Sequence, residues 1–143
     1  MRQKTLSVAE SCTGGLLGSL ITDTPGSSDY FLGGIIAYHN DIKSGLLSVP
    51  KKTLKKHGAV SAETAKSMAR NVRKIFESDL GIAITGIAGP GGATAQKPVG
   101  LVYIALASKG NVSCKKYFFT GSRKKIKSQS AKSALKLLAK LNL

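Results

Sequence analysis

The pattern of apolar and polar residues along the chain switches between the period of a strand and the period of a helix. Residues 5–9 form a short run that is typical of a β-strand. Four apolar residues between 16 and 21 then follow at helical spacing. The stretch that joins them, AESCTGG at 9–15, therefore lies at a predicted strand-to-helix junction.

The clearest helix is predicted over 61–78. Ser61 is a suitable N-cap, and Glu63 lies in the first turn, where a carboxylate is favourable. One face of this helix is apolar and consists of Ala65, Met68, Ala69, Val72, Ile75 and Phe76. A further helix is predicted from Ser122 onward. Its apolar side holds Ile126, Ala134, Leu135, Leu138 and Leu141, and another side holds Lys132, Lys136 and Lys140.

Two shorter helices are predicted between these segments. One begins near Asn40 and covers 40–47. In the other, SVPKKTLKKHG, Ser48 is a candidate N-cap, Pro50 stands near the first helical position and Gly58 is a stop signal. The segment 24–29, TPGSSD, has the composition of a turn.

The remaining apolar runs predict strands. GGIIAYH at 33–39 is typical of a buried strand, and the continuous run 80–85 indicates a central one. The runs 101–107 and 113–119 flank the turn SKGN and predict a hairpin. Strands that alternate with helices and end in a hairpin predict an α/β sandwich with a mixed sheet, in one domain over 1–143.

Composition adds a strong positive charge to this picture. The chain has 143 residues, 42% of them apolar, and a net charge of +15 from 18 lysines and four arginines against seven acidic residues. Such an excess of positive charge is typical of proteins that bind nucleic acids, which makes nucleic-acid binding a candidate function. Lysine is a poorer bidentate partner than arginine, however, and the lysines are spread along the chain. We therefore favour a solvated surface and no specific nucleic acid, with a field that attracts a small phosphorylated substrate.

Several other classes of function find no support. Cys12 and Cys114 form neither a disulfide framework nor a metal-ligand spacing, so no metal is expected. No apolar run is long enough to span a bilayer, and the first ten residues lack the apolar core of a signal peptide. We expect a cytoplasmic protein without a membrane partner.

AESCTGG is the first candidate site. A helix start offers free backbone N–H groups, here of Thr13, Gly14 and Gly15, and the two glycines allow close approach to an oxyanion or phosphate. Ser11 at the same junction is a candidate nucleophile. The alternative is an ordinary strand-to-helix turn with a capping hydroxyl.

AYHNDIK at 37–43 is the second candidate, because a serine nucleophile needs a base. His39 and His57 are the two histidines, and His57 has no evident acidic neighbour in the sequence. A Ser-His-Asp triad stays open beside a Ser/Lys pair that uses Lys43. A strongly positive surround and burial both lower a lysine pKa toward neutrality. The alternative for Lys43 is an ordinary surface lysine.

TGIAGPGG at 85–92, followed by KPVG at 97–100, is the third candidate. It opens at the end of a predicted strand, where ligands of α/β sheets commonly bind. It is neither a P-loop nor a dinucleotide-binding fingerprint. The length of the loop favours a function over a purely structural role. The candidate contacts to substrate are Thr85, Gly86, Ala88, Gly89 and Gly91.

Taken in order, AESCTGG, PGSS, AYHNDIK, HGAVS, TGIAGPGG and KPVG resemble the C-terminal domain family of the competence/damage-inducible protein CinA. The resemblance runs from about Leu6 to about Phe119. It implies a three-layer α/β/α sandwich and, from the stand-alone members, a nicotinamide-nucleotide amidase. That activity hydrolyses nicotinamide mononucleotide to nicotinic acid mononucleotide and ammonia without a metal or other cofactor.

The resemblance also implies roles for individual residues. The serine of the family matches Ser11, its tyrosine matches Tyr38 and its lysine matches Lys43. The expected partner is a small pyridine-nucleotide substrate, with a homo-oligomer left open. The alternatives are a family member without activity and a basic module that binds nucleic acid or another protein.

The sequence also departs from the family pattern. Family members usually carry a helix before the first strand, so we expect a neighbouring subunit or the last helix to cover that face. An arginine is common where this chain has Gly33, and an acidic residue is common where it has Gln96.

Overall fold

The computed structural model describes residues 2–143, which form a five-stranded mixed sheet. The strands are β1 (Leu6–Glu10), β2 (Phe31–Ile36), β3 (Leu80–Gly86), β4 (Leu101–Ser108) and β5 (Asn111–Phe118), and their order in the sheet is β2-β1-β3-β4-β5. β1 pairs in parallel with β2 and β3, whereas β4 runs antiparallel to β3 and β5. The carboxyl ends of the three parallel strands therefore meet at one edge of the sheet.

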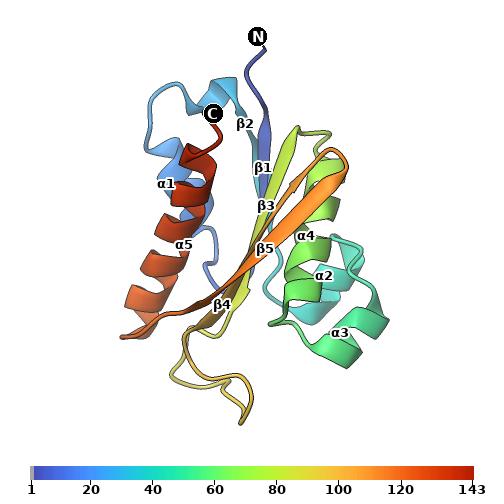
Figure 1. The fold of residues 1–143 in the computed structure, drawn as a ribbon, viewed down its shortest axis with the longest axis vertical. Coiled ribbons are helices and arrows are strands. Elements are labelled where there is room, and N and C mark those ends of the chain that lie inside the picture. Colours follow the sequence, from blue (N-terminus) through green and yellow to red (C-terminus); the bar gives the residue numbers. More distant parts are fainter. Residues whose placement is uncertain (1) are drawn as a thin grey trace.

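Helices cover both faces of the sheet (Figure 1). They are α1 (Leu16–Thr22), α2 (Asn40–Gly45), α3 (Lys51–His57), α4 (Ala62–Ile75) and α5 (Arg123–Ala139), with a short 3₁₀ turn at Ser27–Asp29. α1 and α5 lie on one side of the sheet, and α2, α3 and α4 lie on the other. The arrangement confirms the predicted α/β fold with a mixed sheet and the three-layer sandwich.

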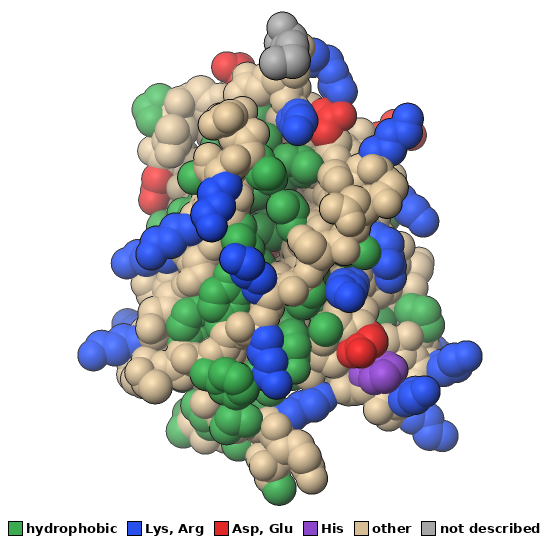
Figure 2. Space-filling view, viewed as in Figure 1, with side chains coloured by type: hydrophobic (Ala, Val, Ile, Leu, Met, Phe, Trp, Pro, Cys, Tyr) green, Lys and Arg blue, Asp and Glu red, His purple; other side chains and the backbone are tan. Residues whose placement is uncertain are grey.

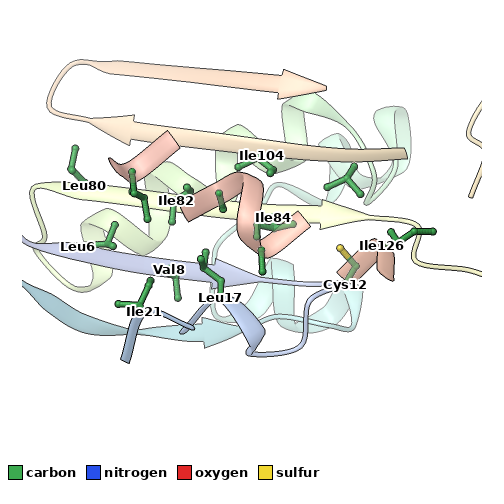
Figure 3. Close-up of a cluster of buried hydrophobic side chains, with 14 of the residues drawn as sticks. Leu6, Val8, Cys12, Leu17, Ile21, Leu80, Ile82, Ile84, Ile104 and Ile126 are labelled. Atoms are coloured by element: carbon green, nitrogen blue, oxygen red, sulfur yellow. The ribbon is translucent and has the colours of Figure 1, made fainter. Parts of the chain in front are cut away.

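The layer between the sheet and the α1–α5 pair is a continuous apolar core (Figure 3). Branched side chains from β1, β3 and β4 meet those of the two helices there. The residues of this core that Figure 3 labels are Leu6, Val8, Cys12, Leu17, Ile21, Leu80, Ile82, Ile84, Ile104 and Ile126. Burial of this surface is the main source of stability for the layer.

The opposite layer depends on close contact between α4 and the sheet. Ser61 caps α4 as predicted, because its hydroxyl accepts a hydrogen bond from the Thr64 N–H. Gly81 on β3 has no side chain, and a Cβ there would lie 2.3 Å from the Ala69 carbonyl oxygen. The predicted face of α4 is buried at Ala65, Met68, Ala69 and Val72.

Three local predictions are wrong. The strand predicted at 33–39 is β2, which ends at Ile36 and lies at the edge of the sheet, so its residues alternate between half-buried and exposed. Ser48 has a φ of +50° and does not cap α3, which Pro50 precedes directly. Ile75 is 50% exposed because it lies in the last turn of α4, beyond the contact with the sheet.

The tail helix is largely as predicted. Ser122 caps α5 through the Lys125 N–H, and Ile126, Ala134 and Leu138 are buried against α1 and the sheet. The predicted lysine side, at 132, 136 and 140, is exposed. No helix within residues 2–143 has both the length and the apolar character that a membrane crossing requires.

Candidate active site

A cavity of about 280 Å³ opens where the parallel strands end. β1 leads into Ser11, β2 leads into Tyr38, and β3 ends at Gly86. Because neighbouring parallel strands end at the same edge, these three segments converge on one site. The cavity brings together eight predicted residues, which are Ser11, Tyr38, Lys43, Thr85, Gly86, Ala88, Gly89 and Gly91.

Ser11 is fixed by its backbone and not by its side chain. Its N–H donates to the Ile84 carbonyl at 3.0 Å, and its own carbonyl accepts from the Gly14 N–H at 3.1 Å. The side chain is 7% exposed and lies on the cavity wall. Within residues 2–143 the Ser11 hydroxyl makes no hydrogen bond, so it is available to a bound substrate.

Lys43 is the most unusual group in the site. It is 1% exposed, and its Nζ donates to the Tyr38 carbonyl at 2.9 Å. No carboxylate in the described part of the chain forms an ion pair with it. Burial without a carboxylate partner lowers the pKa of Lys43 from 10.5 to about 8, and the coulombic interaction with the nearby Cys12 acts in the opposite direction. The amine is therefore within reach of the neutral, basic form near physiological pH.

Cys12 lies beside Ser11 and also lines the cavity, but its side chain packs in the apolar core. It is 6% exposed and belongs to the apolar core under α5. Burial raises the pKa of the Cys12 thiol to about 12. Because the thiolate is the reactive form of cysteine, this thiol is a poor nucleophile.

Tyr38 and Arg123 connect the cavity rim. The Tyr38 side chain is 59% exposed, and its hydroxyl accepts a hydrogen bond from Arg123 at 2.8 Å. Arg123 also donates to the Gly89 carbonyl at 2.5 Å. The guanidinium thus links the segment after β2 to the glycine-rich loop after β3.

Sequence reasoning missed Arg123 and Asn40, both of which line the cavity. Arg123 is one of only four arginines among 22 basic residues and directly follows the capping Ser122. The rarity of arginine in the sequence was the one signal that could have marked Arg123 as a site residue. Its contact with Tyr38 spans 85 positions of the chain, and spacing does not reveal such a contact.

The two histidines do not reach this site. The His39 Nδ1 accepts from the Asp41 N–H at 3.2 Å, and its side chain is 74% exposed. The His57 Nδ1 lies 3.7 Å from a carboxylate oxygen of Glu63, so the expectation that it lacks an acidic neighbour is wrong. Neither histidine is among the described residues that line the cavity. The geometry thus favours a Ser/Lys pair over a Ser-His-Asp triad.

Thr13, Gly14 and Gly15 are not part of the described cavity wall. The Gly14 N–H is already bonded to the Ser11 carbonyl, and a Cβ on Gly15 would lie 3.1 Å from Ile36 Cδ1. The start of α1 is instead occupied by Glu10. This buried carboxylate accepts the N–H groups of Leu17 and Gly18 at 2.8 and 3.0 Å. The donors that make a helix start attractive to an anion are therefore partly satisfied within the chain.

The glycine-rich loop offers other donors. It is closed by hydrogen bonds from Ile87 N–H to the Leu101 carbonyl and from Gly100 N–H to the Ile87 carbonyl. Among residues 2–143, the N–H groups of Ala88, Gly89 and Gly91 have no protein acceptor. The Thr85 hydroxyl is not free, because it donates to the Ala59 carbonyl at 2.8 Å.

The sequence model of the CinA C-terminal domain matches residues 1–142. The chain belongs to the CinA C-terminal domain family. It is similar to a CinA-like protein of Thermotoga maritima, with 48% identity over 97% of this chain and 34% of that protein. A CinA-like protein of Geotalea uraniireducens is 55% identical over 86% of this chain and 29% of that protein. The chain spans about a third of the length of the curated relatives it matches.

Solved structures show the same CinA fold. The competence/damage inducible protein CihA from Agrobacterium tumefaciens has a TM-score of 0.94 and 40% identity, over 98% of this chain and 86% of that chain. A CinA superfamily protein from Escherichia coli has a TM-score of 0.93 and 32% identity, over 97% and 81% of the two chains. These CinA names state no reaction, so the chemistry has to be argued from the site.

Proposed function

We propose that this CinA domain is an amidohydrolase that converts nicotinamide mononucleotide to nicotinic acid mononucleotide and ammonia. One observation carries the proposal above the others. The Lys43 amine is buried, has no acidic partner among the described residues, has a pKa of about 8 and opens on the same cavity as the Ser11 hydroxyl. A weakly basic amine that shares a cavity with an unbonded serine hydroxyl is suited to acyl transfer.

In the first half of the reaction, the Ser11 oxygen attacks the carboxamide carbon. Lys43, in its neutral form, accepts the hydroxyl proton. The tetrahedral intermediate then collapses as its C–N bond breaks, and Lys43 returns the proton to the leaving nitrogen. The products of this half are an ester on Ser11 and one molecule of ammonia.

In the second half, water attacks the Ser11 ester. Lys43 again accepts a proton, this time from the water, and then returns it to the Ser11 oxygen as the C–O bond breaks. The nicotinic acid nucleotide leaves as a carboxylate, and its acid proton is taken up by the ammonia released in the first half. The two halves together consume one water for each amide and need neither a metal nor a redox partner.

Tyr38 has two contacts that support this scheme. Its carbonyl oxygen holds the Lys43 Nζ in place, and its hydroxyl meets Arg123 at the rim. The first contact orients the base through the backbone. The second leaves the phenol beside a cation and close to incoming substrate, where it can assist proton transfer.

Charge and volume are consistent with a nucleotide amide. Arg123 and the unbonded N–H groups of Ala88, Gly89 and Gly91 supply donors for a phosphate or for the developing oxyanion. The net charge of +15 attracts an anionic substrate. The cavity of about 280 Å³ is slightly smaller than the ~300–1,000 Å³ that is usual for small-molecule sites.

The test is ammonia release by the purified protein over a panel of pyridine-nucleotide amides, with Ser11→Ala and Cys12→Ala as matched variants. We expect the wild type to release ammonia from nicotinamide mononucleotide, Ser11→Ala to be inactive while folded, and Cys12→Ala to keep most of the activity. The proposal fails if the wild type hydrolyses none of the amides. The assignment of the nucleophile fails if Ser11→Ala stays active.

A further inference from the structure

Arginine is unevenly distributed in this lysine-rich chain. Arg123 lies at the catalytic cavity, and the other three arginines lie at the opposite end of the sheet, at Arg2, Arg70 and Arg73. Figure 2 shows lysine and arginine side chains at the upper right, where Figure 1 places the β4–β5 turn and the end of α4. Arginine is the side chain best suited to two-point contact with a phosphate or carboxylate.

A cavity of about 300 Å³ opens between the second half of α4 and the turn of the β4–β5 hairpin. The helix contributes Arg70, Arg73 and Lys74, and the hairpin contributes residues 107–108 and 110–112. We call this space the α4–hairpin cavity. Its volume is that of a site for a small molecule.

A second hollow of about 270 Å³ shares Arg73 and Ser108 with this cavity and adds the cations Lys4 and Lys109. It also holds one carboxylate, that of Asp79. This carboxylate is already occupied, because it accepts from Arg2 at 2.7 Å and from the Thr5 N–H at 2.8 Å. The cations around the α4–hairpin cavity are therefore not neutralised by it.

Arg73 is held in one orientation. Its Nε donates to the Asp79 carbonyl at 3.0 Å, and a Cβ on Gly81 would lie 2.7 Å from the Arg73 Cβ, so the side chain starts in close contact with β3. Among residues 2–143, the two Nη groups have no acceptor. A guanidinium that is fixed through Nε and free at Nη is preorganised to bind an anion.

The helix dipole alone does not explain these cations. It favours Arg73 and Lys74, which lie in the last turn of α4. Arg70 lies more than a turn before the helix ends, and Lys109 belongs to the hairpin. No carboxylate in the described part of the chain forms an ion pair with Arg70, Arg73 or Lys74. Uncompensated positive charge from two elements thus surrounds one hollow.

We propose that the α4–hairpin cavity binds the phosphate group of a small phosphorylated molecule, at a site separate from the catalytic cavity. A phosphate monoester carries a charge of about −1.5 to −2 near pH 7 and offers three acceptor oxygens. The free Nη groups of Arg73 bind two of these oxygens, and Arg70 and Lys74 balance the charge. A phosphodiester of a nucleic acid has one charge and extends along a chain, which suits a closed hollow less well.

This proposal does not depend on the amidase activity. The two cavities have no lining residue in common among the described residues. α4 begins at Ala62, next to Val60 of the catalytic cavity, and Arg70 lies about 12 Å farther along the helix axis. A phosphate bound at Arg70 and Arg73 is therefore out of reach of Ser11.

The test is a titration of the ¹⁵N-labelled protein with inorganic phosphate at pH 7, at constant ionic strength, followed by the amide signals in NMR spectra. Signals of Gly110 and Asn111 report on the α4–hairpin cavity, and those of Gly89 and Gly91 report on the catalytic cavity. The variant is Arg70→Gln/Lys74→Gln. The matched control is Lys115→Gln/Lys116→Gln, which removes two exposed charges from β5. Unshifted spectra elsewhere establish that each variant is folded.

We expect saturable shifts of the Gly110 and Asn111 signals in the wild type and in the control, and an affinity at least about tenfold lower in Arg70→Gln/Lys74→Gln. Shifts that do not saturate, or that occur at the catalytic cavity alone, would overturn the proposal. Equal losses in the variant and the control would reduce the effect to net charge and would overturn it too.

A second titration separates the two sources of phosphate. Hexathymidylate without a terminal phosphate offers phosphodiesters only. We expect it to shift the Gly110 and Asn111 signals less than inorganic phosphate does at the same concentration of phosphate groups. An equal or larger saturable shift would assign the cavity to nucleic acid and would contradict a small phosphorylated ligand.

Discussion

At the scale of single residues, Lys43 connects stability to chemistry. A lysine that is 1% exposed and lacks an acidic partner in the described chain is unfavourable to the fold while it is protonated. The same burial makes its amine basic but not permanently charged. Burial of Lys43 therefore lowers the stability of the fold but leaves an amine that can accept a proton, as is common at functional sites.

The effect of Lys43 burial on the free energy of unfolding can be measured as a dependence of that free energy on pH. The Lys43 pKa is about 8 in the folded protein against 10.5 in a free lysine, so the unfolded chain holds one more proton between about pH 8 and pH 10.5. The contribution of Lys43 to the free energy of unfolding therefore rises with pH across that window. The full difference is no more than about 3 kcal/mol, and it is smaller to the extent that cavity water solvates the amine.

Urea unfolding of the wild type and of Lys43→Met at pH 7 and pH 9.5 isolates this effect, because the other titrating groups are common to both proteins. We predict that the wild type gains stability relative to Lys43→Met as the pH rises. If the difference between the two proteins is the same at both pH values, Lys43 has an ordinary pKa in the fold.

At the scale of elements, α5 is both a cover and a support. Its apolar side closes the core over α1 and the sheet, and its first residue, Arg123, reaches the cavity rim. The helix was predictable because Ser122 and the spacing of apolar residues are local signals. Its part in the site was not predictable, because it depends on where the helix packs.

Leu138 tests the covering role of α5. It is 4% exposed within the core cluster, so Leu138→Ala should lower the free energy of unfolding by about 2–5 kcal/mol. Lys136→Ala, an exposed position of the same helix, should change it by less than about 0.5 kcal/mol. Thermal or urea unfolding of both variants makes the comparison. Equal and small effects would show that α5 is not needed to close this layer.

At the scale of the whole molecule, parallel strand ends explain why much of the site was predictable. Ser11, Tyr38 and Lys43 each follow the end of a parallel strand, and such ends converge whatever the details of packing. The sequence did not show whether a strand lies at the edge or in the centre of the sheet, because β2 is as apolar as a buried strand and yet is an edge strand. The contact of Thr13–Gly15 with an anion stays a prediction, and no local signal in the sequence shows that the Glu10 carboxylate turns inward to the N–H groups of Leu17 and Gly18.

The central claim is that Lys43 is the general base for Ser11, and the pH dependence of kcat/KM tests it most directly. We predict that ammonia release from nicotinamide mononucleotide by the wild type rises about tenfold per pH unit up to about pH 8 and then levels, because kcat/KM follows deprotonation of the base in the free enzyme. Lys43→Arg keeps the positive charge but cannot give up its proton, so its rate should be lower by roughly 10²-fold or more, without this rise. A Lys43→Arg variant with near-normal turnover and the pH profile of the wild type would contradict the account.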